Sequence, residues 1–131
     1  MGQTTTKVTI WNLYDLLEVR AGSRLSEDVR NVVIQDAVVD TAVTSIALPL
    51  NVIEKLGLNK RAECWGDQLY DPVRIEIMGR DATFEPIESP ESRSVIIGHV
   101  PLTFMDWVVD FQARKLIGNP AHDGQHVLEL L

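Results

Sequence analysis

The chain has 131 residues, of which 45% are hydrophobic and 24% are charged, and it carries a net charge of −7. This size and composition are typical of one globular domain with its own core. The negative charge disfavours nucleic-acid binding, because no basic block is present to neutralise phosphates. No apolar run approaches the ~20 residues of a membrane span, and no signal-peptide pattern precedes the first expected strand. The single cysteine, Cys64, excludes an internal disulfide and suits a reducing compartment, so we expect a cytoplasmic protein that does not contact membranes.

The first third of the chain predicts two strands. Lys7 and Thr9 alternate with apolar neighbours, so residues 6–11 are expected to form a half-buried strand. Residues 12–20 carry leucines at helical spacing, which leaves a short helix and a long loop both open, and residues 21–26 have the composition of a loop. Residues 27–39 are rich in β-branched side chains and predict one long strand, bulged near Gln35 and Asp36.

The middle third predicts a helix followed by β structure. Pro49 suits the first position of a helix, and Gly57 is typical of a helix end. Residues 59–69 are polar and read as irregular, with a hairpin tip at residues 65–67. Strands are expected at residues 73–77 and 82–87 around a turn at 79–81, and a charged loop follows at residues 88–93.

The last third predicts a short strand at residues 94–98, a short helix at 101–107 and a hairpin with arms at 108–111 and 115–117. The tail is expected to be a loop whose final apolar residues, 127–131, are available as a strand or docking segment. We see no internal repeat and no linker. The sequence therefore predicts a mostly β domain with two short helices, spanning residues 1–131, with a core at about 6–120 and a tail at 121–131.

One carboxylate stands out in this pattern. An apolar run ends at Asp40, which is followed by a turn containing Thr41, Thr44 and Ser45. Aspartate is a poor strand residue, and a carboxylate among valines is costly to desolvate without partners. The pattern indicates either a functional group or a structural Asp that caps the loop or the helix after it.

The segment Asp40-Thr41-Ala42-Val43-Thr44 resembles the Asp-Thr-Gly-Ala-Thr motif of retropepsin-like aspartic proteases. Residues 49–58 resemble the family's helix after that loop, and residues 96–98, Ile-Ile-Gly, resemble its hydrophobic-hydrophobic-Gly strand, which crosses near the active loop. The stretch from residue 102 to 120 looks like the tail of the bacterial single-domain members. These features occur in the family's order, so together they are more specific than the motif alone.

The resemblance implies a closed β-barrel of the acid-protease fold and hydrolysis of a peptide or protein substrate by water, without metal or cofactor. Such enzymes activate the water between two carboxylates that share one proton. Because the chain has one such motif, the second carboxylate is expected from Asp40 of an identical partner, and activity requires a homodimer. Thr41 would hydrogen-bond across the dimer axis, Thr44 would steady the loop through its hydroxyl, and Ala42 would offer its backbone N–H.

The resemblance also implies a substrate pocket. Its expected members are Ile96, Ile97 and Gly98 as a wall, and Trp65 and Gly66 in a flap that is short for the family. Ala42 stands where the family has glycine; with a negative φ alanine costs little there, whereas a positive φ would strain the loop. Two alternatives remain: an inactive dimer of the same fold that binds peptide or acts as a scaffold, and an unrelated β-rich protein in which Asp40 caps a helix.

Other chemistry-bearing residues favour structural interpretations. His122 and His126 have the i, i+4 spacing of a metal pair, but Pro120 and Gly124 argue against a helix, so solvated tail histidines are expected. No motif places a base beside Cys64. His99 follows the Ile-Ile-Gly strand, where retroviral members usually carry Arg, and is expected to be structural. Three carboxylates late in the chain read as solvated loop charges, namely Glu85, Glu88 and Glu91.

Overall fold

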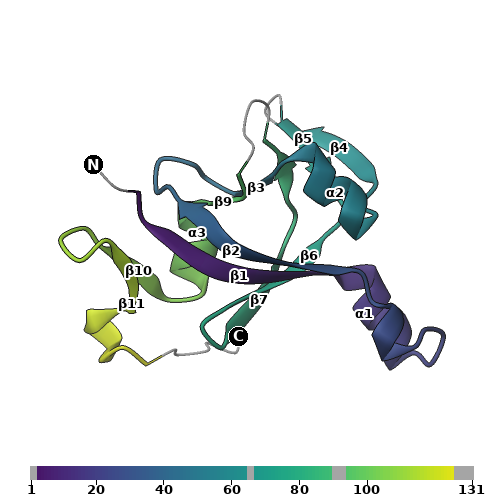
Figure 1. Cartoon of the computed structure of the whole chain (residues 1–131), viewed down its shortest axis with the longest axis horizontal. Helices are drawn as coiled ribbons and strands as arrows, with labels where there is room; N and C mark the ends of the chain where they lie inside the picture. Colours follow the sequence, from purple (N-terminus) through teal and green to yellow (C-terminus); the bar gives the residue numbers. More distant parts are fainter. Residues whose placement is uncertain (1–2, 65–66, 90–93, 126–131) are drawn as a thin grey trace.

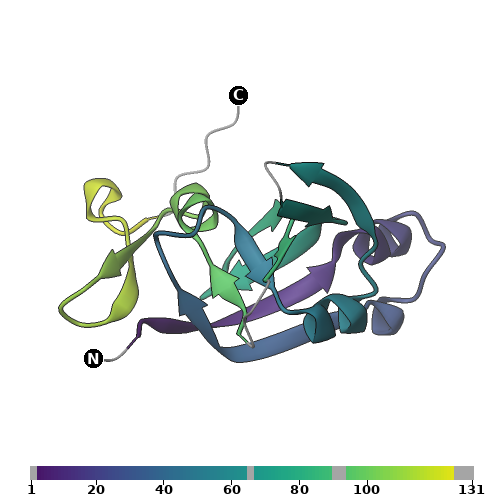
Figure 2. The same ribbon diagram turned by 90° about the horizontal axis from the view of Figure 1, so that it is seen from above.

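The computed structural model of the chain describes residues 3–64, 67–89 and 94–125. Within these residues nine strands form one sheet in the order β4-β5-β8-β3-β9-β2-β1-β6-β7, and β10 and β11 form a separate hairpin. Figures 1 and 2 show the large sheet curling around the core, with α1 at one end of the molecule and the β10–β11 hairpin at the other. The mostly β prediction is confirmed.

The element bounds are as follows. The strands are β1 (Thr5–Asn12), β2 (Asn31–Val39), β3 (Ile46–Leu48), β4 (Lys60–Cys64), β5 (Asp67–Tyr70), β6 (Val73–Ile77), β7 (Arg80–Phe84), β8 (Ile87–Glu88), β9 (Ile96–Ile97), β10 (Trp107–Asp110) and β11 (Lys115–Gly118). The helices are α1 (Leu13–Arg20), α2 (Leu50–Leu56) and α3 (His99–Phe104), with single 3-10 turns η1 (Ser26–Asp28) and η2 (Pro120–His122).

Strand β1 organises the sheet, because it pairs antiparallel with β2 on one side and with β6 on the other. Val8 and Ile10 are fully buried, while Thr9 between them is half-buried, as the alternation in the sequence predicts. The β1–β2 register shifts between Thr6 and Val8, opposite the predicted bulge at residues 35 and 36. The prediction that β2 starts at residue 27 is wrong, because Ser26–Asp28 form the 3-10 turn η1.

Helix α2 lies where the sequence predicts it. Pro49 occupies the N-cap, one residue before the first helical position that the sequence predicts for it, and Gly57 ends the helix with φ 65°, the left-handed conformation that glycine adopts without steric cost. Its buried face consists of Val52, Ile53 and Leu56, which join the core with the apolar residues of β1, β3 and β6. Burying such side chains contributes roughly 1.5–3 kcal/mol each, so this face holds the helix to the sheet.

Several boundaries differ from the prediction. The segment read as irregular between residues 59 and 69 contains β4 and β5, which pair as a hairpin up to Cys64 opposite Asp67. Residues 82–87 are divided between β7 and β8, with Pro86 before the second. Helix α3 starts two residues earlier than predicted, at His99, and ends at Phe104. The open choice at residues 12–20 is settled as a helix, α1, whose N-cap Asn12 accepts a hydrogen bond from the Asp15 backbone N–H.

The C-terminal hairpin is tied to the sheet through Arg80 at the start of β7. Its guanidinium lies 3.9 Å from the centroid of the Trp107 ring and donates to the carbonyl oxygens of Met105 and Asp106. The Asp106 carboxylate in turn lies 2.7 Å from Nδ1 of His122. His122 is exposed, as expected of a solvated tail histidine, and this contact with Asp106 is an addition that the sequence did not predict. His126 and residues 127–131 lie outside the described residues.

Candidate active site

The loop at residues 40–45 connects β2 to β3 and presents the Asp40 side chain. Asp40 donates its backbone N–H to the carbonyl oxygen of Ile97 (3.1 Å), and its own carbonyl accepts the N–H of Val43 (3.1 Å). The Asp40 carboxylate accepts the backbone N–H of Ala42 through Oδ1 at 3.0 Å. This two-residue contact is typical of an Asx turn, so the loop conformation is set locally by Asp40 itself.

Strand β9 fixes the loop from the side. Ile97 pairs with Val39 of β2 in parallel and with Ile46 of β3 in antiparallel, so β9 lies between the two strands that flank the loop. The structure thus brings the Asp40 motif and the Ile-Ile-Gly motif together, although they are separated by more than fifty residues of sequence. The two isoleucines differ in placement, since Ile97 is 0% exposed in the core whereas Ile96 is half-buried.

The start of α3 holds the loop through its backbone. The first N–H groups of a helix have no partner within the helix, and here three consecutive N–H groups donate to the carbonyl oxygens of the Asp40 loop. The donors and acceptors are Gly98 to Ser45 (2.9 Å), His99 to Val43 (2.8 Å) and Val100 to Thr44 (3.0 Å). His99 adds a second contact, with Nδ1 3.3 Å from the Val43 carbonyl oxygen, so its placement beside the loop agrees with a structural role.

Gly98 is required by this close approach. A Cβ at Gly98 would overlap the carbonyl oxygens of Ser45 and Val43. Its backbone is extended, with φ −86° and ψ −176°, so the need for glycine arises from space rather than from the backbone conformation. The Ile-Ile-Gly motif therefore has a physical explanation in this chain: only a residue without a side chain lets β9 and α3 contact the loop.

Ala42 fits the loop without backbone strain. It is not among the non-glycine residues with positive φ, which are Met78, Asp106, Arg114 and Asp123. Ala42 therefore has a negative φ, and alanine costs little conformational free energy at this position. Thr41, Ala42 and Thr44 are all exposed. In the described part of the chain the hydroxyls of Thr41 and Thr44 have no hydrogen-bond partner, and Thr44 steadies the loop through its carbonyl oxygen.

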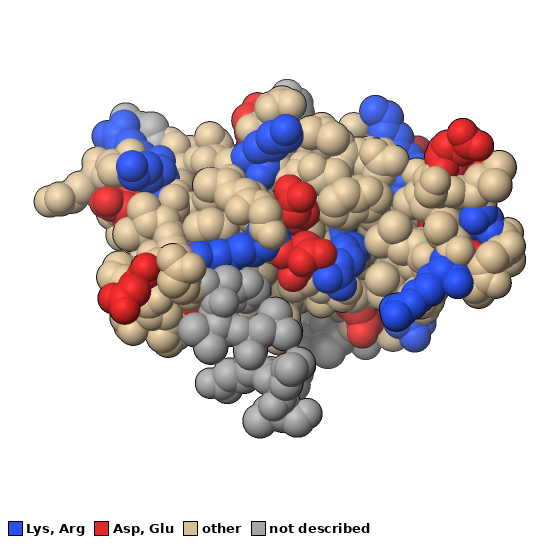
Figure 3. Space-filling view, turned by 90° about the horizontal axis from the view of Figure 1, so that it is seen from below, with Lys and Arg blue, Asp and Glu red and all other residues tan. Residues whose placement is uncertain are grey.

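Two predicted site residues remain, the flap candidates Trp65 and Gly66. Both lie outside the described residues. Within the residues that the structure describes, no group of three or more His, Cys, Asp or Glu side chains is arranged to hold a metal ion. The face of the molecule in Figure 3 mixes cationic and anionic side chains with uncharged surface between them.

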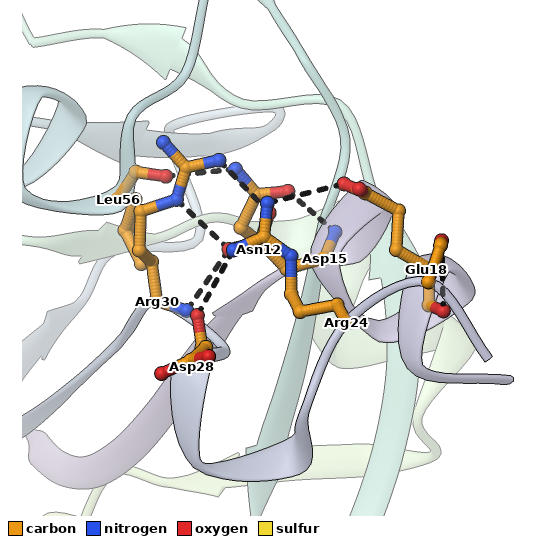
Figure 4. Close-up of polar contacts among 8 residues, drawn as sticks. Asn12, Asp15, Glu18, Arg24, Asp28, Arg30 and Leu56 are labelled. Carbon is orange, nitrogen blue, oxygen red and sulfur yellow. Dashed lines mark hydrogen bonds and ion pairs between the residues drawn. The ribbon is translucent and has the colours of Figure 1, made fainter.

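A buried polar cluster at α1 was not predicted from the sequence (Figure 4). Asp15 is fully buried and accepts three hydrogen bonds from Arg30, from its backbone N–H (3.0 Å), Nε (2.8 Å) and Nη2 (2.8 Å). Arg24 adds an ion pair at 3.3 Å. The hydrogen bonds from the Arg30 side chain hold the pKa of Asp15 below its usual value.

The same cluster links α1 to α2. Asn12, whose side-chain oxygen caps α1, donates through Nδ2 to the carbonyl oxygen of Leu56 at 2.8 Å. Asn12 is buried, so this bond satisfies a donor that would otherwise be costly to bury. The sequence carried a signal for the cap of α1 alone, namely Asn12 placed before a leucine-rich run with Asp15 three residues later.

Comparison with solved structures identifies the architecture. The chain is similar to the retroviral protease-like domain of Ddi1 from Leishmania major, with a TM-score of 0.53 and 17% sequence identity, over 99% of this chain and 97% of that one. The chain has a retropepsin-like fold. No family model matches it, and neither does any curated protein, so the finer assignment to the bacterial single-domain type is not supported. Among the described residues, no helix is both long enough and apolar enough to span a membrane.

Proposed function

We propose that this domain is an aspartic endopeptidase whose catalytic pair is formed by Asp40 from each subunit of a homodimer. The observation that carries the proposal is the geometry of the Asp40 loop: an Asp-Thr sequence in a retropepsin-like fold, fixed from both sides by β9 and by the first turn of α3. A loop held by this many backbone hydrogen bonds presents its carboxylate in one position, which catalysis requires.

The dimer is required because a single chain supplies one carboxylate. In the described part of the chain the Asp40 carboxylate has one hydrogen-bond donor, the N–H of Ala42, and no contact with another acid. Thr41 and Ala42 at the tip of the loop are exposed and available to a partner. Val100, whose N–H bonds to the loop, has an exposed apolar side chain, and so does Phe104 at the other end of α3, which is 68% exposed; a second copy seated on the loop would cover Val100 first.

The reaction follows from the pairing of two carboxylates. Two like charges held a few ångströms apart do not both ionise, so the pair carries one proton. The ionised carboxylate takes a proton from the attacking water, and the protonated one stabilises the oxyanion formed from the peptide carbonyl. In this arrangement Thr41 and Thr44 maintain the loop, Ala42 offers its N–H, Ile96 contributes to the substrate pocket, and Trp65 and Gly66 belong to the covering flap.

The test is cleavage of a peptide library between acid and neutral pH, with Asp40→Asn as the matched variant. We expect cleavage by the natural protein, with a bell-shaped dependence on pH, and its loss in Asp40→Asn while the fold is retained. Sedimentation across a concentration series should show a dimer in both proteins. Cleavage that persists in Asp40→Asn refutes the catalytic assignment, and a monomer that cleaves refutes the dimeric pair.

One observation favours a second candidate, a dimer of the same fold that binds peptide without cleaving it. The Ala42 side chain is exposed at the loop tip, where the family's glycine leaves room for substrate. A dimer without activity at any pH, in which labelled peptides still bind with micromolar affinity, would support this second candidate over the first.

A further inference from the structure

A groove runs between β2 and α2, away from the Asp40 loop. It has a volume of about 490 Å³. Its lining consists of residues 29–34, at and just before the start of β2, and of Asn51, Val52 and Lys55 on α2. Val33 lies seven residues before Asp40, or about 23 Å along the extended strand. The groove is therefore separate from the candidate active site.

The groove follows an unpaired edge of the sheet. Strand β1 pairs with β2 on one side, but β9 pairs with the other side only at Val38 and Val39. The Arg30 carbonyl accepts from Asn12 on the β1 side, and backbone groups alternate direction along an antiparallel strand. Asn31 and Val33 consequently direct their N–H and C=O groups away from β1. Among the described residues, neither has a backbone partner on that side.

Natural proteins usually block such an edge. Proline, a bulge or an inward-pointing charge prevents another strand from pairing with it. Residues 31–34 contain none of these and read Asn-Val-Val-Ile. Val33 is 49% exposed, while Val32 and Ile34 are partly buried against the core. A strand added at this edge would pair with the free backbone groups of β2. One face of the added strand would contact apolar side chains of the core, and its opposite face would be exposed to solvent.

The charged side chains that line the groove indicate what kind of peptide it would bind. Its lining contains two cations, Arg30 and Lys55, and no carboxylate. Arg30 is already paired with Asp15, whereas Lys55 forms no ion pair within the described part of the chain. Lys55 is therefore available to a carboxylate of the occupant, and this local attraction favours an acidic segment in the groove even though the protein as a whole is negatively charged.

We propose that this groove binds an extended acidic peptide segment of a partner protein, which adds a strand to the free edge of β2. The backbone groups of Asn31 and Val33 pair with the peptide backbone. Alternate apolar side chains of the peptide pack on the core side, and a carboxylate reaches Lys55. This mode of binding gives affinity through main-chain hydrogen bonds and specificity through alternate side chains.

The probe is a fluorescein-labelled eight-residue peptide of alternating valine and glutamate, and binding is followed by fluorescence anisotropy with the full chain. We expect saturable binding that Lys55→Glu weakens by about tenfold or more. Lys115→Glu makes the same charge change at an exposed residue of β11, and should leave the dissociation constant within about twofold. Equal effects of the two variants, or no binding of the probe, overturn the proposal.

Backbone pairing is tested separately from charge. Two further probes are used: one is N-methylated at every valine and the other at every glutamate. Each therefore lacks the N–H donors along one edge of the peptide strand. We expect one methylated probe to lose binding and the other to retain it, because a strand presents alternate N–H groups to alternate sides. If both bind as tightly as the unmodified probe, strand addition is refuted.

The position of the probe is tested by amide hydrogen exchange. Addition of the unmodified probe should slow the exchange of the Asn31 and Val33 N–H groups and leave that of Ile10, which faces β2 on the paired side, unchanged. Slowed exchange confined to the Asp40 loop would place the peptide in the candidate active site and overturn the proposal. Protection of Val33 that rises with protein concentration without probe would assign the edge to a second copy, which also overturns it.

Discussion

Replacing Gly98 with alanine tests whether the close approach of β9 and α3 holds the Asp40 loop. The added Cβ would overlap the carbonyl oxygens of Ser45 and Val43, and it would lie 2.8 Å from the Val43 carbonyl carbon. These are backbone atoms, so no side-chain rotation relieves the overlap. The extended backbone of Gly98 accepts alanine without conformational strain, and the whole cost is therefore steric.

The expected loss of stability in Gly98→Ala is the sum of two costs. Overpacking a well-packed site costs about 1–3 kcal/mol. Moving the loop away from Gly98 also weakens the three hydrogen bonds that it receives from the start of α3, each worth about 1 kcal/mol. With part of these bonds retained after relaxation, we expect Gly98→Ala to lower the free energy of unfolding by roughly 3–5 kcal/mol.

The assay is urea unfolding followed by circular dichroism, with Gly79→Ala as the matched control. Gly79 has φ 85° and nothing within 4 Å of an added Cβ, so its replacement measures conformational strain without overlap, about 1–2 kcal/mol. A loss in Gly98→Ala no larger than that in Gly79→Ala would refute the steric reasoning. Unchanged amide chemical shifts for residues 40–45 in Gly98→Ala would equally show that the loop does not depend on this contact.

Two further predictions concern the buried cluster and the loop tip. Asp15→Asn should lower the free energy of unfolding by about 2–4 kcal/mol at pH 7, because it removes the charge of a fully buried carboxylate that accepts three hydrogen bonds from Arg30. Since those bonds hold the pKa of Asp15 below 3.8, the stabilisation is fully present above that pH and is lost as the pH falls through the lower, folded-state value. Urea unfolding between pH 2 and 7 should therefore show a constant difference between the two proteins above about pH 4 and a shrinking one below it; a difference that stays constant down to pH 2 would contradict this. Ala42→Gly should lower stability by about 0.4–1 kcal/mol through the greater freedom of the unfolded chain, with cleavage rates within a few-fold of the natural protein; a gain of tenfold or more would instead show that the methyl group obstructs substrate.

The parts of the fold that follow from the sequence are those with local causes. Helix α2 is bounded by Pro49 and Gly57, and the β1 strand follows from alternating burial. The juxtaposition of Asp40 with Gly98 was predicted through the resemblance, because both motifs are short and distinctive. Strand β4, by contrast, was not predicted. It begins with two exposed charged residues, Lys60 and Arg61, so its sequence lacks the alternation of apolar and polar residues that indicates a strand.

The cluster around Asp15 could not be predicted, because it joins residues that are distant in sequence and ordinary in type. Asp15 and Arg30 are fifteen positions apart, and in the sequence each resembles a solvated surface charge. Only the fold places Arg30 at the start of β2 against the first turn of α1. That placement buries the Asp15 carboxylate. The free-energy cost of its burial is offset by the hydrogen bonds that it accepts.

The same cluster determines the shape of the proposed peptide groove. Arg30, one of its lining residues, is held by Asp15, and Asn12 ties the neighbouring β1 to the last turn of α2 through Leu56. The two walls of the groove are thus linked through one set of buried polar groups. At the other end of β2 the Asp40 loop is held by a different set, the backbone of β9 and α3. Asp15→Asn should therefore weaken binding of the valine–glutamate probe while leaving the amide shifts of residues 40–45 unchanged, and Gly98→Ala should do the reverse, because the two ends of β2 are supported independently.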